Sequence, residues 1–254
     1  MNADTPLTSN HLFKLLAHDL RWQIIRRLAL SDCRVSDLTI ELQQSANLIS
    51  YHVGLLRAAG LLNERRSDAD GRDSYYQLDL DCLGTNYRAV GLGLHPALLG
   101  APAEALAVAT EPCRPRVLFL CTHNSARSQM AEAIMRARSH GAIEVRSAGS
   151  EPTAIHPAAV RVLERVGIDV GDQRTKDIAE FVGQHFDYAI TVCDRVREVC
   201  PAFTAAAVQA HWSIADPAAT TGSPLEQDQA FEQTLRQLDV RIGHLLLLLK
   251  GSKE

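Results

Sequence analysis

A cysteine and an arginine, with five residues between them, form the pair in this chain best suited to chemistry. The apolar run 117–120 leads to Cys121, and Arg127 and Ser128 precede a helix-like stretch at 129–138. A strand, a tight loop and a helix N-terminus direct backbone N–H groups and the positive end of the helix dipole at one point. The guanidinium of Arg127 adds a planar fork for a tetrahedral oxyanion.

In such a positive field we expect the pKa of Cys121 to fall, so that the side chain acts as a thiolate nucleophile. The plainer interpretation is a cysteine buried at a strand end beside an unrelated surface arginine. The order of strand, loop and helix argues against it, because that order brings the two side chains to the same place.

Two further cysteines suggest redox chemistry. A second buried strand is expected at 187–192 and ends at Cys193, and Cys200 follows seven residues later. Seven residues of helix rise about 10.5 Å, whereas a disulfide needs Cα atoms closer than about 7 Å. The two thiols can bond only if the segment between them unwinds or loops out, which suits a relay better than a static link. Two buried thiols or an incidental pair of metal ligands are the alternatives.

A third element is Asp216, which precedes Pro217 after a strand-like segment at 207–213. An aspartate on a loop after a strand could protonate a leaving oxygen. Taken alone, Asp-Pro signals only a turn.

With these pieces in place, residues 115–254 resemble the low-molecular-weight tyrosine phosphatase fold and, within it, the thioredoxin-coupled arsenate reductases. The resemblance rests on segments 121–128, 147–149 and 211–217 and on the pair Cys193 and Cys200. It implies an α/β domain with a parallel sheet flanked by helices.

Two differences from simple phosphatases of this fold bear on the substrate. Those enzymes do not need the second and third cysteines, and they usually follow Asp-Pro with an aromatic residue that packs against the phosphotyrosine ring. This chain has Ala218 and Ala219 there. Both differences favour a small inorganic oxyanion over an aryl phosphate.

The resemblance also implies a mechanism. Cys121 would attack arsenic while Asp216 protonates the departing oxygen, and Ser128 would donate a hydrogen bond to the thiolate. Cys193 would then attack the adduct, arsenite would leave, and Cys200 would carry the oxidation to a thioredoxin-like reductant. The substrate would be held by the loop residues Thr122, His123, Asn124, Ser125, Ala126 and Arg127.

Some members of this family bind potassium beside the loop. The oxygen-bearing candidates here are Asn124, Glu132 and Ser147, which do not make a full ligand set. We expect no tightly bound cofactor besides a possible potassium ion.

The first third of the chain has a different pattern. Apolar residues recur at helical spacing between positions 12 and 28, and further helices are expected at 35–43 and 45–57, the last ending near Gly60. Two strand-like segments, 62–67 and 73–79, then flank a turn. Helices followed by a hairpin predict an α+β winged helix-turn-helix domain in residues 1–85.

Segment 49–61 closely resembles the recognition helix of the ArsR/SmtB repressors, which are dimers that bind operator DNA. The resemblance implies that some side chains of this helix face the major groove and that nearby arginines meet phosphates. A solvated helix face is the alternative, and we favour it for His52 taken alone. The residues expected to contact DNA are Asn47, Ser50, Tyr51, His52, Arg57, Arg65, Arg66 and Arg72.

The chain departs from that family at the arsenic-binding thiols. Where arsenic-sensing members carry a Cys-x-Cys pair, Arg34 and Ser36 stand here, and Cys33 is one residue away. Trivalent arsenic prefers two or three soft thiolates. Cys33 is therefore a possible arsenite ligand only together with Cys82 or Cys113.

Composition fits two soluble domains joined by a linker. The chain has 254 residues, a net charge of −4 and 46% hydrophobic residues, which gives no sign of general nucleic-acid affinity. Residues 86–114 are expected to hold a dimerisation helix and linker that make the homodimer. We expect a cytoplasmic location with no membrane association, because no apolar leader is apparent and six cysteines suit a reducing compartment.

Three hypotheses follow for the function. The first is an arsenate reductase fused to an ArsR-type transcriptional regulator. The second is a tyrosine phosphatase of the same fold with a regulatory DNA-binding domain. The third is a regulator whose second domain binds an oxyanion without catalysis.

Overall fold

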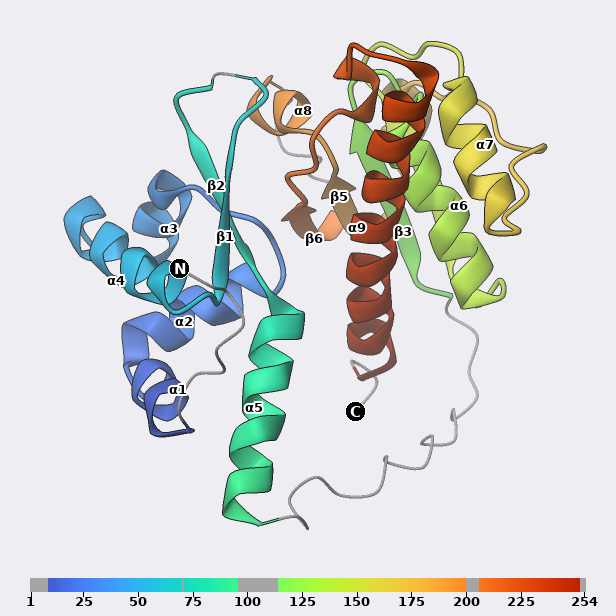
Figure 1. Ribbon diagram of the computed structural model, residues 1–254. Helices are drawn as coiled ribbons and strands as arrows, with labels where there is room; N and C mark the ends of the chain where they lie inside the picture. Colours follow the sequence, from blue (N-terminus) through green and yellow to red (C-terminus); the bar gives the residue numbers. More distant parts are fainter. Residues whose placement is uncertain (1–8, 70, 96–113, 200–205, 252–254) are drawn as a thin grey trace. The chain divides into compact units, whose positions relative to one another are not determined.

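The computed structural model describes residues 9–69, 71–95, 114–199 and 206–251. The chain divides into two compact units, the first ending at Pro112 and the second running on from Cys113 (Figure 1). Each unit has its own apolar core. The expected linker falls largely in residues 96–113, which lie outside the described residues.

The first unit is a set of helices followed by a hairpin and one more helix. Its elements are α1 (Ser9–Leu16), α2 (Asp19–Leu28), α3 (Val35–Leu42), α4 (Ala46–Ala58), β1 (Leu62–Arg66), β2 (Ser74–Leu78) and α5 (Leu80–Leu94). The helical pattern between positions 12 and 28 is split in two, because His18 caps α2 by accepting a hydrogen bond from the backbone N–H of Leu20. The predicted helices and hairpin are confirmed.

Local signals fix the ends of these elements. Ser45 caps α4 by accepting a hydrogen bond from the N–H of Leu48, and Gly60 ends it with a left-handed backbone (φ 74°). The antiparallel pair β1–β2 aligns Leu62 with Leu78, and a single bridge from Cys33 to Tyr76 adds a third short pairing. The hairpin is thereby attached to the segment that precedes α3.

The second unit is a four-stranded parallel sheet with strand order β4-β3-β5-β6. The strands are β3 (Arg116–Cys121), β4 (Glu144–Gly149), β5 (Phe186–Thr191) and β6 (Ala206–His211), and the helices are α6 (Arg127–Ser139), α7 (Pro157–Arg165), α8 (Asp194–Val199) and α9 (Pro224–Gly251). Short 3-10 helices span Ile178–Phe181 and Pro217–Ala219. The predicted parallel α/β domain is confirmed.

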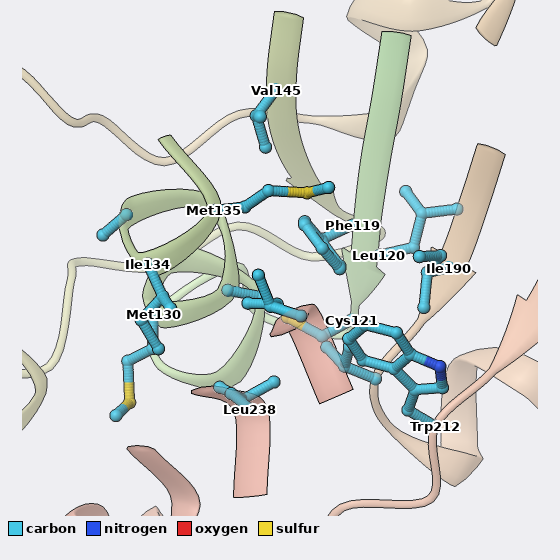
Figure 2. Packing of buried hydrophobic residues seen from close by; sticks show 14 of the residues in the cluster. Phe119, Leu120, Cys121, Met130, Ile134, Met135, Val145, Ile190, Trp212 and Leu238 are labelled. Carbon is cyan, nitrogen blue, oxygen red and sulfur yellow. The ribbon is translucent and has the colours of Figure 1, made fainter. Parts of the chain in front are cut away.

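The core of this unit explains why β3 reads as an apolar run. Every residue of β3 after Arg116 is buried, as expected for a central parallel strand covered on both faces. Figure 2 shows Phe119 and Cys121 on the side of β3 that faces Met130 and Met135 of α6, with Trp212 and Leu238 close by, and Leu120 on the other side near Ile190. The nucleophile candidate therefore stands at the end of a rigid strand, where it is held by its neighbours.

Candidate active site

The structure places Cys121 at the carboxyl end of β3, followed by a loop and the first turn of α6. Its Sγ lies 2.8 Å from Ser128 Oγ and accepts a hydrogen bond from the backbone N–H of Asn124 at 3.1 Å. The N-terminus of α6 has no side-chain cap, so its first N–H groups remain available to an anion. The predicted order of strand, loop and helix is confirmed.

The expected fall in the pKa of Cys121 is wrong. Complete burial raises the pKa of this thiol above its ordinary value, and the nearby Cys193 acts in the same direction. The hydrogen bond from Ser128, the charge of Arg127 and the Asn124 N–H lower it without reversing the shift. Cys121 is thus a buried thiol surrounded by groups that stabilise its anion.

Arg127 and Asp216 meet at this loop. The guanidinium Nη2 of Arg127 lies 2.9 Å from Asp216 Oδ2, and its Nη1 donates to the backbone carbonyl of Ile214 at 2.9 Å. The Asp216 carboxylate also accepts a hydrogen bond from the N–H of Ala218. The arrangement brings a carboxyl group able to move a proton next to the arginine that the sequence assigns to an oxyanion.

The backbone of the loop is tied to the segment that follows β4. The carbonyls of Thr122, His123 and Ser125 accept hydrogen bonds from the N–H groups of residues 151, 153 and 156. The side chain of His123 adds a contact from Nδ1 to the carbonyl oxygen of Glu151 at 3.2 Å. Loop residues 122–126 therefore present their backbone in one fixed shape.

Asn124 and Gly149 make that shape possible. Asn124 has a left-handed backbone (φ 46°) and is fully buried. A Cβ on Gly149 would lie 2.5 Å from the carbonyl oxygen of Thr122 and 2.8 Å from the backbone N of Asn124. Only glycine leaves room for the loop to pass this close to the end of β4.

Cys193 lies beside this loop, two residues after the end of β5, the strand next to β3. It follows β5, which pairs with β3, and the N–H of Val192 donates to the carbonyl of Leu120 at 2.7 Å. The Sγ of Cys193 is 3.5 Å from Thr122 Oγ1, and the side chain is buried. Cys200 lies outside the described residues. The structure thus brings Cys121 and Cys193, the first two thiols of the predicted relay, to the carboxyl end of the parallel sheet.

Asp194, the residue after Cys193, is fixed by side chains at and after the end of β6. The buried carboxylate of Asp194 accepts a hydrogen bond from Ser213 Oγ at 2.8 Å and contacts His211 Nε2 at 3.1 Å. These contacts connect the start of α8 to the end of β6. They fix the backbone that carries Cys193 at its position beside the loop.

The candidate potassium ligands are brought together, but a lysine ammonium stands among them. Asn124 Nδ2 donates to Ser147 Oγ at 2.8 Å, and Ser147 Oγ donates to Glu132 Oε2 at 2.6 Å. Lys176 Nζ lies 3.1 Å from the same carboxylate oxygen. An oxygen cage for a metal cation does not fit a place that already holds a positive charge. Among the residues that the structure describes, no cluster of three histidine, cysteine or acidic side chains is placed to hold a metal.

Sequence reasoning missed three residues of this site: Gln129, Gly149 as a spacing residue, and Lys176. The side chain of Gln129 donates to Asn124 Oδ1 at 3.0 Å, and the backbone N–H of Lys176 donates to the same oxygen at 2.8 Å. Neither Gln129 nor Lys176 belongs to a local motif. Their roles arise from contacts across the fold.

In the first unit, most side chains expected to contact DNA are accessible. Asn47, Ser50 and Tyr51 are exposed on α4, with Tyr51 at 62%. Among the arginines, Arg57, Arg66 and Arg72 are exposed and Arg65 is half-buried. Arg57 also forms an ion pair with Glu64, and Arg66 donates to the carbonyls of residues 71 and 72.

The prediction that His52 faces the major groove of DNA is wrong. His52 is 4% exposed, its ring lies 4.4 Å from that of His18, and its Nδ1 has no hydrogen-bond partner within the described part of the chain. Burial and the nearby His18 and Arg21 lower its pKa. His52 belongs to the buried stripe of α4.

The thiol considered for arsenite is also poorly placed. Cys33 is buried, and burial raises its pKa to about 12. Cys82 is half-buried, and Cys113 lies outside the described residues. The guanidinium of Arg34 pairs with Asp37 at 3.2 Å and with Asp73 at 2.8 Å, and so connects α3 to the hairpin. No helix in the described part of the chain is long and apolar enough to cross a bilayer.

Residues 116–254, more than half of the chain, match the family described as low molecular weight phosphotyrosine protein phosphatase. The chain belongs to this family. An arsenate reductase of Halalkalibacterium halodurans is 34% identical over 126 residues, which cover 50% of this chain and 91% of that protein. A glutaredoxin arsenate reductase of Synechocystis sp. is 32% identical over 131 residues, which cover 52% of this chain and 95% of that protein. These relatives confirm the prediction of an enzyme of the arsenate reductase kind.

A solved structure described as an arsenate reductase in the phosphate binding state is also similar. It is 30% identical and covers 53% of this chain and 98% of its own chain, with a TM-score of 0.47.

Proposed function

We propose that the second unit reduces arsenate to arsenite with thiols as the electron donors. The observation that carries this proposal is the second buried cysteine. Cys193 lies beside the nucleophile loop, with its Sγ 3.5 Å from Thr122 Oγ1, and it follows β5, the strand next to the one that ends at Cys121. A phosphatase of this fold needs only the first cysteine, whereas a reductase needs a second thiol within reach of the adduct.

The chemistry follows from the positions of these groups. Arsenate docks on the N–H groups of loop 122–126 and on the guanidinium of Arg127. The Cys121 thiol gives its proton to an oxygen of the bound arsenate and its sulfur attacks arsenic, with Ser128 Oγ and the Asn124 N–H stabilising the sulfur anion. Asp216, beside Arg127, protonates the departing oxygen, and a bond between Cys121 Sγ and arsenic results.

Two electrons then pass from sulfur to arsenic. The Cys193 thiolate attacks Cys121 Sγ, the sulfur–arsenic bond breaks with its electron pair on arsenic, and arsenite leaves. A Cys121–Cys193 disulfide remains. Cys200 attacks Cys193, which restores the Cys121 thiol, and a thioredoxin-like dithiol reduces the Cys193–Cys200 disulfide.

The experiment that tests this function is arsenate turnover with a thioredoxin system, measured beside hydrolysis of an aryl phosphate. We expect turnover of arsenate, and its loss in Cys121→Ser, because a hydroxyl cannot enter a disulfide. Arg127→Lys should lose most activity because a point charge replaces the fork. Arg161→Lys, in an ion pair with Asp228, is the matched control. Aryl phosphate hydrolysis without arsenate turnover would favour the phosphatase, and neither activity would favour an oxyanion-binding regulator.

We also propose that the first unit is an ArsR-type winged helix that binds operator DNA as a dimer. Support comes from the pair α3 and α4 followed by the hairpin β1–β2, which is the order of a winged helix-turn-helix. The exposed residues Asn47, Ser50 and Tyr51 lie on one accessible side of α4. We further propose that this DNA-binding domain spans residues 1–85 and that the second domain starts at residue 115. We also propose that the chain forms a homodimer and is located in the cytoplasm.

DNA binding is tested by titrating the full chain against duplex fragments from the region upstream of its own gene. We expect one fragment to bind with an affinity that falls steeply as salt rises. Tyr51→Ala should weaken that binding, whereas Trp22→Ala, which alters an exposed aromatic residue on α2, should not. Binding that is equal for all fragments, or unchanged by Tyr51→Ala, would contradict the assignment of α4 as the recognition helix.

A further inference from the structure

A continuous chain of side-chain hydrogen bonds connects Cys121 to a buried ion pair on the far side of the loop. Cys121 Sγ contacts Ser128 Oγ at 2.8 Å, and Asn124 Nδ2 lies 2.9 Å from that hydroxyl and 2.8 Å from Ser147 Oγ. Ser147 Oγ is in turn 2.6 Å from Glu132 Oε2. The chain ends at the ammonium of Lys176, 3.1 Å from the same oxygen and 2.8 Å from the carbonyl of Arg174.

The donors in this chain are fixed by the chemistry of the amide. Asn124 has two N–H donors on Nδ2, and both are used, so the hydroxyls of Ser128 and Ser147 accept from it. Each hydroxyl then has its own proton to direct elsewhere. Ser147 donates to the Glu132 carboxylate, and Ser128 donates to Cys121 Sγ once that sulfur is a thiolate with no proton of its own. The ability of Ser128 to stabilise the thiolate thus depends on how Asn124 is held.

The carboxylate at the other end needs a cation. The side chain of Glu132 is 2% exposed, and that of Lys176 is 8% exposed. A carboxylate buried this far from water is strongly destabilised unless a positive charge and hydrogen bonds compensate it. Arg136 also contacts Glu132, but its side chain is 43% exposed and reaches the other oxygen, Oε1. Lys176 is the cation on the oxygen that accepts from Ser147.

We propose that Lys176 supplies, from the chain itself, the cation that holds this network, so that the Cys121 loop works without a potassium ion. The oxygens of Glu132 and Arg174 would suit an alkali cation, and the ammonium already contacts both. The amide oxygen of Asn124 is taken by the N–H of Lys176 and by Gln129. Lys176 is a positioning residue, which acts on the nucleophile through Glu132, Ser147 and Asn124.

A role of Lys176 in catalysis rests on the proposed function. Its effect on stability and on the reactivity of Cys121 can be tested without arsenate. Thermal unfolding of the full chain and the pH profile of Cys121 alkylation are measured in potassium chloride and in choline chloride of equal ionic strength. We expect both measurements on the wild-type protein to be the same in the two salts. In choline, Lys176→Met should unfold at a lower temperature, and its Cys121 should be alkylated roughly tenfold more slowly at a fixed pH, the effect of losing one oriented hydrogen bond to an anion.

Potassium should restore Lys176→Met toward the wild-type values, because the vacated position then offers carboxylate and carbonyl oxygens to the ion. Arg136→Met is the matched control, because it removes the other cation from Glu132 and should create no dependence on potassium. Should Lys176→Met fail to fold, the double variant Glu132→Gln with Lys176→Met removes both charges and should show no difference between the two salts.

Four results would overturn the proposal. The wild-type protein could need potassium, or the double variant could respond to it. The Lys176→Met protein could match the wild type in choline, or it could fail to be restored by potassium. A wild-type protein that behaves the same in both salts but does not turn over arsenate would contradict the proposed function. It would not contradict the role of Lys176.

Discussion

Removing the hydroxyl of Ser128 should make Cys121 a much slower nucleophile. In Ser128→Ala the sulfur loses a donor that lies 2.8 Å away and whose proton is directed at it by Asn124. A hydrogen bond to a charged group contributes about 1.5–3 kcal/mol. Since about 1.4 kcal/mol corresponds to a factor of ten, alkylation of Cys121 at a fixed pH should slow on the order of tenfold to a hundredfold.

The pH dependence has a definite sign. Burial holds the pKa of the Cys121 thiol above its ordinary value, so the thiol is mostly protonated near neutral pH and alkylation accelerates as the pH rises. Ser128→Ala removes an interaction that lowers this pKa, and the profile should therefore move to higher pH. The assay is iodoacetamide labelling over a pH series, with the modified peptide quantified by mass spectrometry.

Ser139→Ala is the matched control, because Ser139 ends the same helix and donates to the carbonyl of Arg136, away from the thiol. Its profile should coincide with that of the wild type. An unchanged profile in Ser128→Ala, with the fold intact, would refute the reasoning. It would mean that the hydroxyl does not stabilise the sulfur anion.

Two further predictions test the loop and the first unit. Gly149→Ala should lower stability by about 1–3 kcal/mol, because its Cβ would lie 2.5 Å from the carbonyl oxygen of Thr122; Gly54→Ala, which has open space beside it, should not, and equal melting temperatures would contradict this. Cys33, whose burial raises its pKa to about 12, should resist alkylation in the folded protein and react only after urea unfolding. Rapid labelling of Cys33 under native conditions would show that the segment before α3 opens.

Much of the site could be predicted because it is contiguous in the chain. A strand ending at Cys121, a loop and a helix starting at Arg127 form one local unit, and local patterns specify such units. The meeting of Arg127 with Asp216 was predicted only through the family resemblance, since the two are far apart in sequence. Lys176 and Gln129 carry no motif, because their roles depend on which backbone passes beside Asn124.

Two predictions were wrong: the groove contact of His52 and the lowered pKa of Cys121. The sequence carried a signal against the first of them. On α4 the buried residues Ile49, His52, Val53 and Leu56 follow helical spacing, so the period itself placed His52 on the inner face. For Cys121, the sequence shows the neighbouring groups that stabilise a thiolate. It does not show the cost of removing that thiolate from water, because this cost depends on the packing of α6 and the loops around it.

The most direct test of thiol-based arsenate reduction is the identity of the disulfide that forms in Cys200→Ser after one exposure to arsenate. Without the third thiol, the oxidation should stop between Cys121, the last residue of β3, and Cys193, the buried cysteine that follows the neighbouring strand β5. Peptide mapping of protein alkylated in acid would identify the bond. We expect one arsenite released per chain and a stable Cys121–Cys193 disulfide. Full multiple turnover in Cys200→Ser, or arsenite release with no bond between these two residues, would contradict it.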